Sequence, residues 1–484
     1  MRCLYSLSAS IALLLAAAPV ARAQRSDTLA LSLPDAINLA FRSSDEARLA
    51  GAATELAGAQ FESARASLFP QLRFNGTYSH VYRSARAVAV GAVFNQPNTY
   101  TTTANLSQSL FQGGRELYGW RSAERLRGAA ELTERETRAQ VTLDVQRAYL
   151  QALYTDRAVD IRRQNFALVD SQVAQVERLE KAGRAARYDV LVARVNRANQ
   201  EPLLQQAIED RTLALLELKR ILNLPAEQPL TLSTSLDASM VEPLLTAAGD
   251  SVMNAADRPS VRAAELTARA RHEAIGVARA DYLPTIGVNV ALGYQAFPFG
   301  NTLPSFQGQR VPTTCASPAT GICSTQNGGF FPDRSLSLTV TWPIFDGFRT
   351  KANVDIARAL ALVADLQLQQ QRETATIDIA RARADLVRTR ATFTARRQNS
   401  TEAGEALQLA SLRFARGLST QLEVSTAQLA LLTAQTDEAR SIYDLYLASA
   451  SLLRALGRPM PLPPGVLPPS RTSLKTDTSA QISR

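Results

Sequence analysis

The chain has 484 residues, a formal net charge of +9, two histidines and three cysteines. So few histidines and cysteines offer little to a metal-dependent or thiol-dependent active site. We find neither a nucleophile–base arrangement nor a glycine-rich phosphate loop, so the sequence predicts a protein that is not an enzyme and holds no cofactor. The positive charge does not indicate nucleic-acid binding, because arginines alternate with acidic residues along the chain instead of forming a basic stripe.

Residues 1–23 have the features of an export signal. Arg2 precedes an apolar run from Ile11 to Val20, and Ala21-Arg22-Ala23 places small residues where a signal peptidase cleaves. An N-terminal membrane anchor is the alternative, but the run is too short to span a bilayer. We therefore expect cleavage before Gln24, which removes two arginines and lowers the net charge from +9 to +7.

The remaining chain contains a duplication. The motif Leu110-Phe111-Gln112-Gly113-Gly114-Arg115 returns 234 residues later as Ile344-Phe345-Asp346-Gly347-Phe348-Arg349. Earlier in each half, Ala66-Ser67-Leu68-Phe69-Pro70 returns as Ala280-Asp281-Tyr282-Leu283-Pro284 at an offset of 214 residues. The difference predicts one longer loop, so we expect a first repeat over residues 24–242 and a second over 243–459 with a longer surface loop at 298–334. A proline-rich tail, residues 460–484, is expected to be disordered.

Four segments, two in each repeat, alternate apolar and polar residues with the period of a β-strand. Their apolar positions are Leu72, Phe74 and Tyr78; Tyr100, Leu106 and Leu110; Ile286, Val288, Val290, Leu292 and Tyr294; and Leu336, Leu338, Val340, Trp342 and Ile344. Each run has about ten residues, which is enough for a tilted strand to cross a membrane. A soluble sheet with one wet face is the alternative, but aromatic residues toward both ends of the strands favour a transmembrane barrel.

Four strands are too few to close a barrel, and an open edge in lipid would leave backbone groups unpaired. Several copies of the chain must therefore share one barrel. The residues alone do not decide between two copies with eight strands and three copies with twelve.

The segments between the strand pairs predict long helices. Apolar residues recur at helical spacing at Val141, Val145, Ala148, Tyr149 and Ala152. No proline occurs from Gly114 to Lys181 or from Arg349 to Arg416, so each run predicts one helix roughly 100 Å long. Each run then reaches a glycine, Gly183 or Gly417, where we expect a turn and a returning helix.

Cys315 and Cys323 both lie in the longer loop of the second repeat, whereas Cys3 leaves with the signal. In an oxidising compartment we expect the two to form a disulfide. Two free thiols are the alternative, because spacing alone sets no geometry.

These features resemble the outer-membrane efflux protein family, the TolC-like channels. The resemblance covers residues 34–460 and rests on the two repeated motifs at the strand ends and on the second helical turn. That turn reads Arg413-Phe414-Ala415-Arg416-Gly417-Leu418-Ser419, followed by Leu422-Glu423-Val424. The family implies a mainly α fold with transmembrane β-strands: a long α-helical barrel joined to a shared 12-stranded outer-membrane β-barrel. It implies a homotrimer with two structural repeats per chain, seated in outer-membrane lipid and extending into the periplasm.

The resemblance also implies a passive conduit in a tripartite efflux or type I secretion system. Its partners would be a periplasmic adaptor (membrane fusion) protein and an inner-membrane pump of the RND, ABC or MFS type. A structural envelope protein that spans the periplasm without transport is the alternative.

The family's adaptor contacts fall on the helical turns, here Gly183 and Arg184 in the first and Gly417, Leu418 and Ser419 in the second. The second turn matches the family pattern. The first, Gly183-Arg184-Ala185, departs from it, so we expect the two turns to contact a partner differently.

The resemblance further assigns a pore constriction to Asp189, Glu423 and Phe414. Phe414 stands where some members carry a tyrosine that holds the closed gate by a hydrogen bond. Asp189 and Glu423 have a simpler interpretation that stays open beside the pore role: acids in the first turn of a helix each stabilise it by about 0.3–1 kcal/mol.

Overall fold

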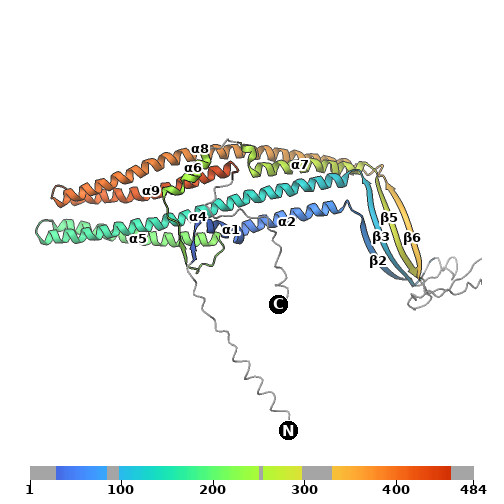
Figure 1. Cartoon of the computed structure of the whole chain (residues 1–484), viewed down its shortest axis with the longest axis horizontal. Coiled ribbons are helices and arrows are strands. Elements are labelled where there is room, and N and C mark those ends of the chain that lie inside the picture. Colours follow the sequence, from blue (N-terminus) through green and yellow to red (C-terminus); the bar gives the residue numbers. More distant parts are fainter. Residues whose placement is uncertain (1–28, 84, 86–97, 250–253, 297–329, 459–484) are drawn as a thin grey trace, which may run out of the picture. The chain divides into compact units, whose positions relative to one another are not determined.

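The structure is a computed structural model that describes residues 29–83, 85, 98–249, 254–296 and 330–458 (Figure 1). The signal segment, Cys315 and Cys323, most of the longer loop and the tail lie outside the described residues, so the expectations about them stay predictions. The chain divides into two compact units. The helical unit comprises Met1–Arg48, Arg138–Met253 and Ile379–Arg484, and the sheet unit comprises Leu49–Thr137 and Asn254–Asp378.

Helices make up most of the described chain. They are α1 (Leu33–Ser43), α2 (Asp45–Ala66), α4 (Arg115–Lys181), α5 (Arg187–Ile221), α6 (Glu242–Gly249), α7 (Pro259–Arg279), α8 (Arg349–Ala415) and α9 (Gln421–Ala455), with short 3-10 helices η2 (Ala238–Met240), η3 (Ala255–Asp257) and η4 (Ala280–Tyr282). The predicted long helices are confirmed. Helices α4 and α8 have 67 residues each, and α5 and α9 have 35 each. No described helix contains a stretch apolar and long enough to cross a membrane.

The sheet unit contains a four-stranded antiparallel sheet in the order β2-β3-β5-β6. Its strands are β2 (Gln71–His80), β3 (Asn98–Gln112), β5 (Thr285–Ala296) and β6 (Phe330–Thr341). These are the four predicted strands, although β6 ends at Thr341, before Trp342 and Ile344. Strands β2 and β6 are the edges of the sheet within the described chain.

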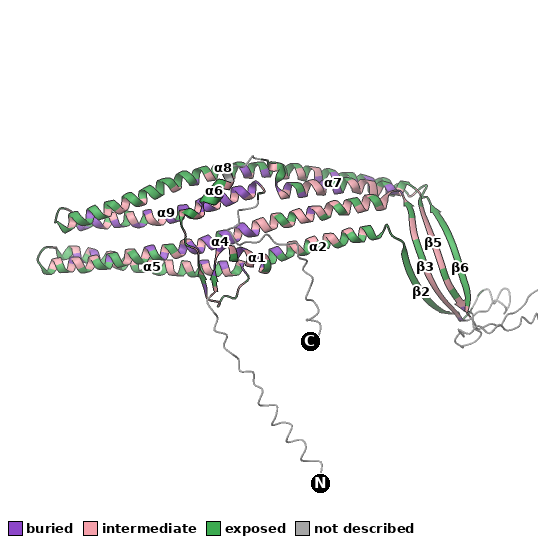
Figure 2. Cartoon of the chain, in the orientation of Figure 1, coloured by how far each residue is buried: buried purple, intermediate pink, exposed green. Residues whose placement is uncertain are grey.

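Up to Ser109 of β3, the register places the apolar residues of all four strands on one face. Between Ser109 and Phe111 a β-bulge shifts the β3·β5 register by one residue. One row across the sheet consists of Leu72, Leu106, Val290 and Leu336. This face is uncovered: Leu72 is 72% exposed and Leu336 is 75% exposed, and Figure 2 shows β2 and β6 exposed along their length. The predicted phase of the alternation is therefore confirmed except at Leu110, which lies in the bulge.

Several contacts outside the sheet also hold the sheet unit together, and two of them are especially close. Where β3 leads into α4, Gly113 has φ +62°, and a Cβ on it would lie 2.5 Å from the carbonyl oxygen of Ala280. The backbones therefore approach too closely for any other residue. Farther along the helices, Arg258 before α7 forms ion pairs with Glu136 on α4 (3.1 Å) and Asp378 on α8 (2.8 Å), with only 7% of its side chain exposed.

The helical unit has its core where α4 and α9 carry apolar stripes. The residues predicted from helical spacing, Val141, Val145, Ala148, Tyr149 and Ala152, are all buried. The Tyr149 hydroxyl donates to the carbonyl oxygen of Leu31 at 2.9 Å, beside a short parallel pair formed by β1 (Leu29–Leu31) and β4 (Leu230–Leu232). Helix α6 packs against α9 in the same unit.

Candidate functional site at the helical turns

The first helical turn joins α4 to α5 through Gly183, which has φ +71°. The Gly183 N–H donates to the carbonyl oxygen of Glu180 at 2.8 Å, and the Arg184 N–H donates to that of Leu179 at 2.8 Å. This is the usual way to end a helix with a left-handed residue, and glycine adopts that conformation without a steric penalty. The Arg184 side chain is exposed.

The second turn, between α8 and α9, has the same backbone. Gly417 has φ +76°, its N–H donates to the carbonyl oxygen of Phe414 at 2.9 Å, and the Leu418 N–H donates to that of Arg413 at 2.9 Å. What differs is the exposed side chain: Leu418 is 66% exposed where the first turn has Arg184. Ser419 is half-buried. The two turns therefore share a backbone conformation but expose different side chains, an arginine in the first and a leucine in the second.

Asp189 and Glu423 occupy the third position of the returning helices but have different partners. The Asp189 carboxylate accepts the Ala186 N–H at 3.1 Å. At the second turn, Thr420 caps α9 and accepts the Glu423 N–H at 3.4 Å. The Glu423 carboxylate instead pairs with Arg413 at 3.2 Å. The helix-terminal interpretation describes Asp189 well and Glu423 only in part.

Phe414 is partly buried in an apolar cluster with residues of the first hairpin. It packs against Val176, Val190 and Ala193, so it holds the α8–α9 hairpin against the α4–α5 hairpin inside the helical unit. A phenylalanine has no hydroxyl, so a gate-holding hydrogen bond from this side chain is ruled out. Any contribution of Phe414 to a gate comes from packing.

The hairpins also carry exposed apolar side chains, of which only Leu422 belongs to a motif named from the sequence. On α5 these are Tyr188, Leu191 and Val195; on α9 they are Leu422 and Leu429; each is between 49% and 73% exposed. Their spacings of three, four and seven residues were readable as helix faces. Periodicity alone does not tell such a face from an ordinary core face, so only the structure identifies them as uncovered.

The other face of the sheet is polar and borders a cleft of about 920 Å³ with α2 and α4. The lining includes Arg73, Ser107, Gln112, Asn289 and Thr341. Hydroxyl and amide side chains of this kind can hold water along the wall.

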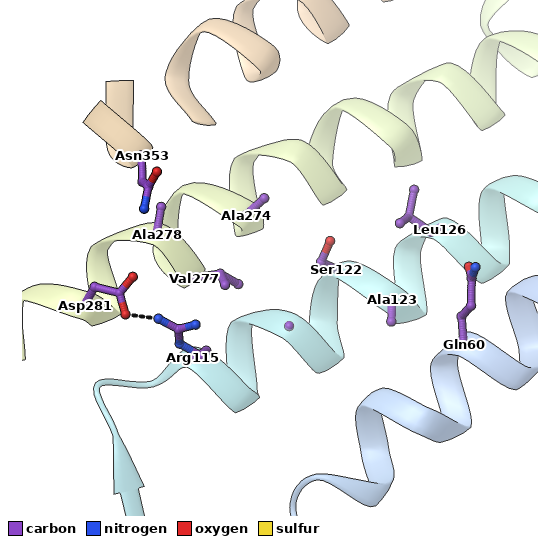
Figure 3. Close-up of a pocket in the computed structure, with 11 residues that line it drawn as sticks. Gln60, Arg115, Ser122, Ala123, Leu126, Ala274, Val277, Ala278, Asp281 and Asn353 are labelled. Atoms are coloured by element: carbon purple, nitrogen blue, oxygen red, sulfur yellow. Dashed lines mark hydrogen bonds and ion pairs between the residues drawn. The ribbon is translucent and has the colours of Figure 1, made fainter. Parts of the chain in front are cut away.

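A second cleft, of about 410 Å³, lies where α2, α4 and α7 meet. In Figure 3 Arg115 and Asp281 point toward each other at one end of it and form an ion pair. The rest of the lining is mostly small, with Gly119, Ala123, Ala274 and Ala278 among it. Nothing in this cleft pairs a nucleophile with a base.

Comparison with known proteins gives one family. A model of the family described as outer membrane efflux protein matches residues 36–224 and 253–458. The chain is similar to the pyoverdine export outer membrane protein OpmQ of Pseudomonas putida, with 26% identity over 441 residues, or 88% of this chain and 85% of that protein.

Two solved structures share the fold. The outer membrane protein VceC of Vibrio cholerae aligns with a TM-score of 0.69 and 19% identity, covering 88% of this chain and 96% of that chain. The open state of the Neisseria gonorrhoeae MtrE channel aligns with a TM-score of 0.69 and 21% identity, covering 88% and 89%. Since the family match covers most of the chain, including both helical turns, the chain belongs to the outer membrane efflux protein family.

Proposed function

We propose that three copies of this chain form a passive channel across the outer membrane and periplasm, the outer-membrane component of a tripartite efflux or type I secretion system. The observation that carries the proposal is the sheet register, which gives one exposed apolar face for lipid and one polar face for water. Such a sheet is suited to the wall of a water-filled barrel. Cargo crosses this barrel by diffusion.

The two edges of the sheet support shared closure. Strands β2 and β6 have unpaired edges in the described chain, and lipid offers no hydrogen bonds to such an edge. Twelve strands from three copies remove every edge. The matched lengths of α4 with α8 and of α5 with α9 support two repeats per chain and a helical barrel of near-equivalent hairpins.

The partners act at the helical turns. A periplasmic adaptor contacts Gly417, Leu418 and Ser419, and contacts Gly183 and Arg184 in a different way, because a leucine and an arginine face solvent at equivalent places. An inner-membrane pump of the RND, ABC or MFS type supplies the energy. Asp189, Glu423 and Phe414 narrow the pore at this end. An export signal over residues 1–23 and a Cys315–Cys323 disulfide in the surface loop complete the proposal.

Planar-bilayer recording of the purified full-length protein tests the channel directly. We expect discrete conductance steps, whereas a structural tether without transport would give none. In cells, Leu418→Glu is expected to abolish efflux while oligomers remain in the outer membrane, and Leu418→Ile is the matched control that keeps the apolar surface. Normal efflux with Leu418→Glu would remove the adaptor contact from this turn.

A further inference from the structure

The two strand pairs within the repeats have the same register. Gln71 on β2 lies opposite Ser107 on β3. Adding the sequence offsets of 214 and 234 gives Thr285 and Thr341, which lie opposite each other on β5 and β6. The offsets found in the sequence therefore hold residue by residue through the sheet.

Strands β3 and β5 pair where the first repeat meets the second. The corresponding pair between two copies would be β6 of one copy with β2 of the other. Within the chain, Ser107 lies opposite Asn289 and Gln112 opposite Thr285. Between these two pairs the β3·β5 register shifts by one residue, at a β-bulge between Ser109 and Phe111. The same offsets turn the pairs into Thr341 opposite Asn75 and Asp346 opposite Gln71, with the bulge carried to residues 343–345. The transferred register also matches apolar residues with apolar ones, since Phe111 opposite Ile286 becomes Phe345 opposite Leu72.

The end of β6 fits a strand that lacks its neighbour. Strand β3 continues to Gln112 because its last residues pair with the start of β5. Strand β6 stops at Thr341, although the equivalent of Gln112 is Asp346. Residues 342–346 include the first part of the repeated motif but have no strand beside them in the described chain. Pro343 replaces Ser109 here and offers no backbone N–H, which a strand tolerates at an edge or a bulge.

The junction β3·β5 within the chain and the junction between β6 and β2 of two copies differ in their charged residues. Within the chain, Arg115 pairs with Asp281 across the β3·β5 junction. The equivalents of these residues are Arg349 and Ser67, so that ion pair has no counterpart between copies. The transferred register instead brings Asp346 diagonally opposite Arg73, at positions where the within-chain junction has the uncharged Gln112 and Gly287.

Both side chains are available for such a contact. Arg73 is exposed and has no ion pair with any described residue. One carboxylate oxygen of Asp346, Oδ2, accepts the N–H and the hydroxyl of Thr350 at 2.8 Å and 2.5 Å, which leaves Oδ1 for a second partner. Diagonal neighbours on one face of an antiparallel pair lie about 7–8 Å apart at Cα, within reach of an arginine.

We propose that β6 pairs with β2 of a second copy in the register that β3·β5 has within the chain, with Asp346 and Arg73 of the second copy forming an ion pair beside this seam. An arginine–carboxylate hydrogen bond is among the stronger polar contacts available to a protein. Because this ion pair forms only between β6 of one copy and β2 of another, it favours that pairing over other pairings of the sheet edges. The inference rests on the proposed shared barrel and adds its register and the residues that select it.

Disulfide trapping tests the register. In a Cys315→Ser, Cys323→Ser background, Asn75→Cys with Thr341→Cys places two cysteines opposite each other, within the Cα separation that a disulfide tolerates. The control, Ser79→Cys with Thr341→Cys, is four residues out of register, about 13 Å along the strand. We expect copy-to-copy cross-links on non-reducing denaturing gels for the first pair alone.

A double-mutant cycle tests the ion pair. Arg73→Gln and Asp346→Asn, of which the second keeps an acceptor for Thr350, are each expected to lower the temperature at which the oligomer dissociates in detergent. The double variant is expected to lower it no further than the worse single variant.

The failures are distinguishable. Conducting oligomers that cross-link through the control pair, or through neither pair, overturn the register and leave the channel standing. Additive losses in the cycle overturn the ion pair. Absence of both oligomers and conductance in the wild-type protein overturns the proposed function itself.

Discussion

The guanidinium of Arg413 lies 3.2 Å from the carboxylate of Glu423 at the second helical turn. The equivalent acid at the first turn, Asp189, accepts a backbone N–H from Ala186 instead. The position equivalent to Arg413 in the first repeat is Leu179, which carries no charge. Two acids in matching places therefore differ in how much of their charge is offset by a neighbouring cation.

Ion selectivity should separate these two acids if the turns narrow the pore. We expect Asp189→Asn to reduce cation preference more than Glu423→Gln, because Arg413 already offsets the charge of Glu423. Arg413→Gln should raise cation preference. Reversal potentials across a salt gradient in planar bilayers measure all three, at low ionic strength where charges are least screened. Identical selectivity in all variants would leave only the helix-terminal role.

Loss of the buried Arg258 should weaken the sheet unit. Its hydrogen bonds to Asp378 and Glu136 more than offset the effect of burial and raise its pKa above the usual arginine value. Arg258→Met removes one partner of a buried ion-pair cluster, which is expected to cost about 3–5 kcal/mol. The matched control is Arg262→Met, because Arg262 pairs with Asp257 while more than half of each side chain stays exposed, and such a pair contributes about 0–1 kcal/mol. Thermal unfolding in detergent compares the two, and equal losses would contradict the importance of burial.

Gly113 and Gly347 are equivalent in the repeat but should respond differently to alanine. Gly113→Ala is expected to destabilise the folded chain by at least about 2 kcal/mol, because its Cβ would meet the backbone of Ala280 and the left-handed conformation adds strain. Gly347 has φ +69°, so alanine meets the same left-handed strain there, but a Cβ on it has nothing within 4 Å. In the proposed seam, however, Ala66 of the second copy takes the place that Ala280 has beside Gly113.

Gly347→Ala is therefore expected to leave the secondary structure of the chain intact and to reduce the yield of oligomers. Circular dichroism and native gels on the two variants make the comparison. Normal oligomer yield from Gly347→Ala would argue against close approach at this point of the seam.

Alkaline stability should depend on Tyr446 in the helical unit. Burial raises the pKa of Tyr446 from 10.0 to about 12. The unfolded chain therefore loses this proton at a lower pH than the folded chain does. The stabilisation is fully present below pH 10 and is lost as pH rises toward 12, on the order of 3 kcal/mol for a shift of about two units.

Tyr446→Phe should flatten this part of the pH dependence. The variant is also expected to be less stable than wild type at pH 9, because Gln146 Nε2, which donates to the Tyr446 hydroxyl at 3.3 Å, loses its buried partner. Urea unfolding at pH 9 and pH 11 gives both quantities. The same loss between these pH values in both proteins would assign the dependence to other groups.

The long helices and the strands were predictable because their signals are local and repeated. Proline-free runs end at Gly183 and Gly417, and alternation of period two is unambiguous over ten residues. The pairing of β1 with β4 was not predictable, since three-residue strands have no periodicity and their partners lie about 200 residues apart. The same holds for the helical turns. The turn glycines were predictable from the sequence, whereas the partners of Asp189 and Glu423 depend on how the side chains are placed in the folded turn.

The placement of β2 and β6 at opposite edges of the sheet has a genetic consequence. In a ring built head to tail, each copy contacts one neighbour through β2 and the other neighbour through β6. Every copy is therefore needed to close the ring. A subunit with an intact β2 and a damaged β6 would still enter the ring and then leave it unclosed. An allele that alters only the β6 edge should therefore be dominant over the wild type, while a null allele should be recessive.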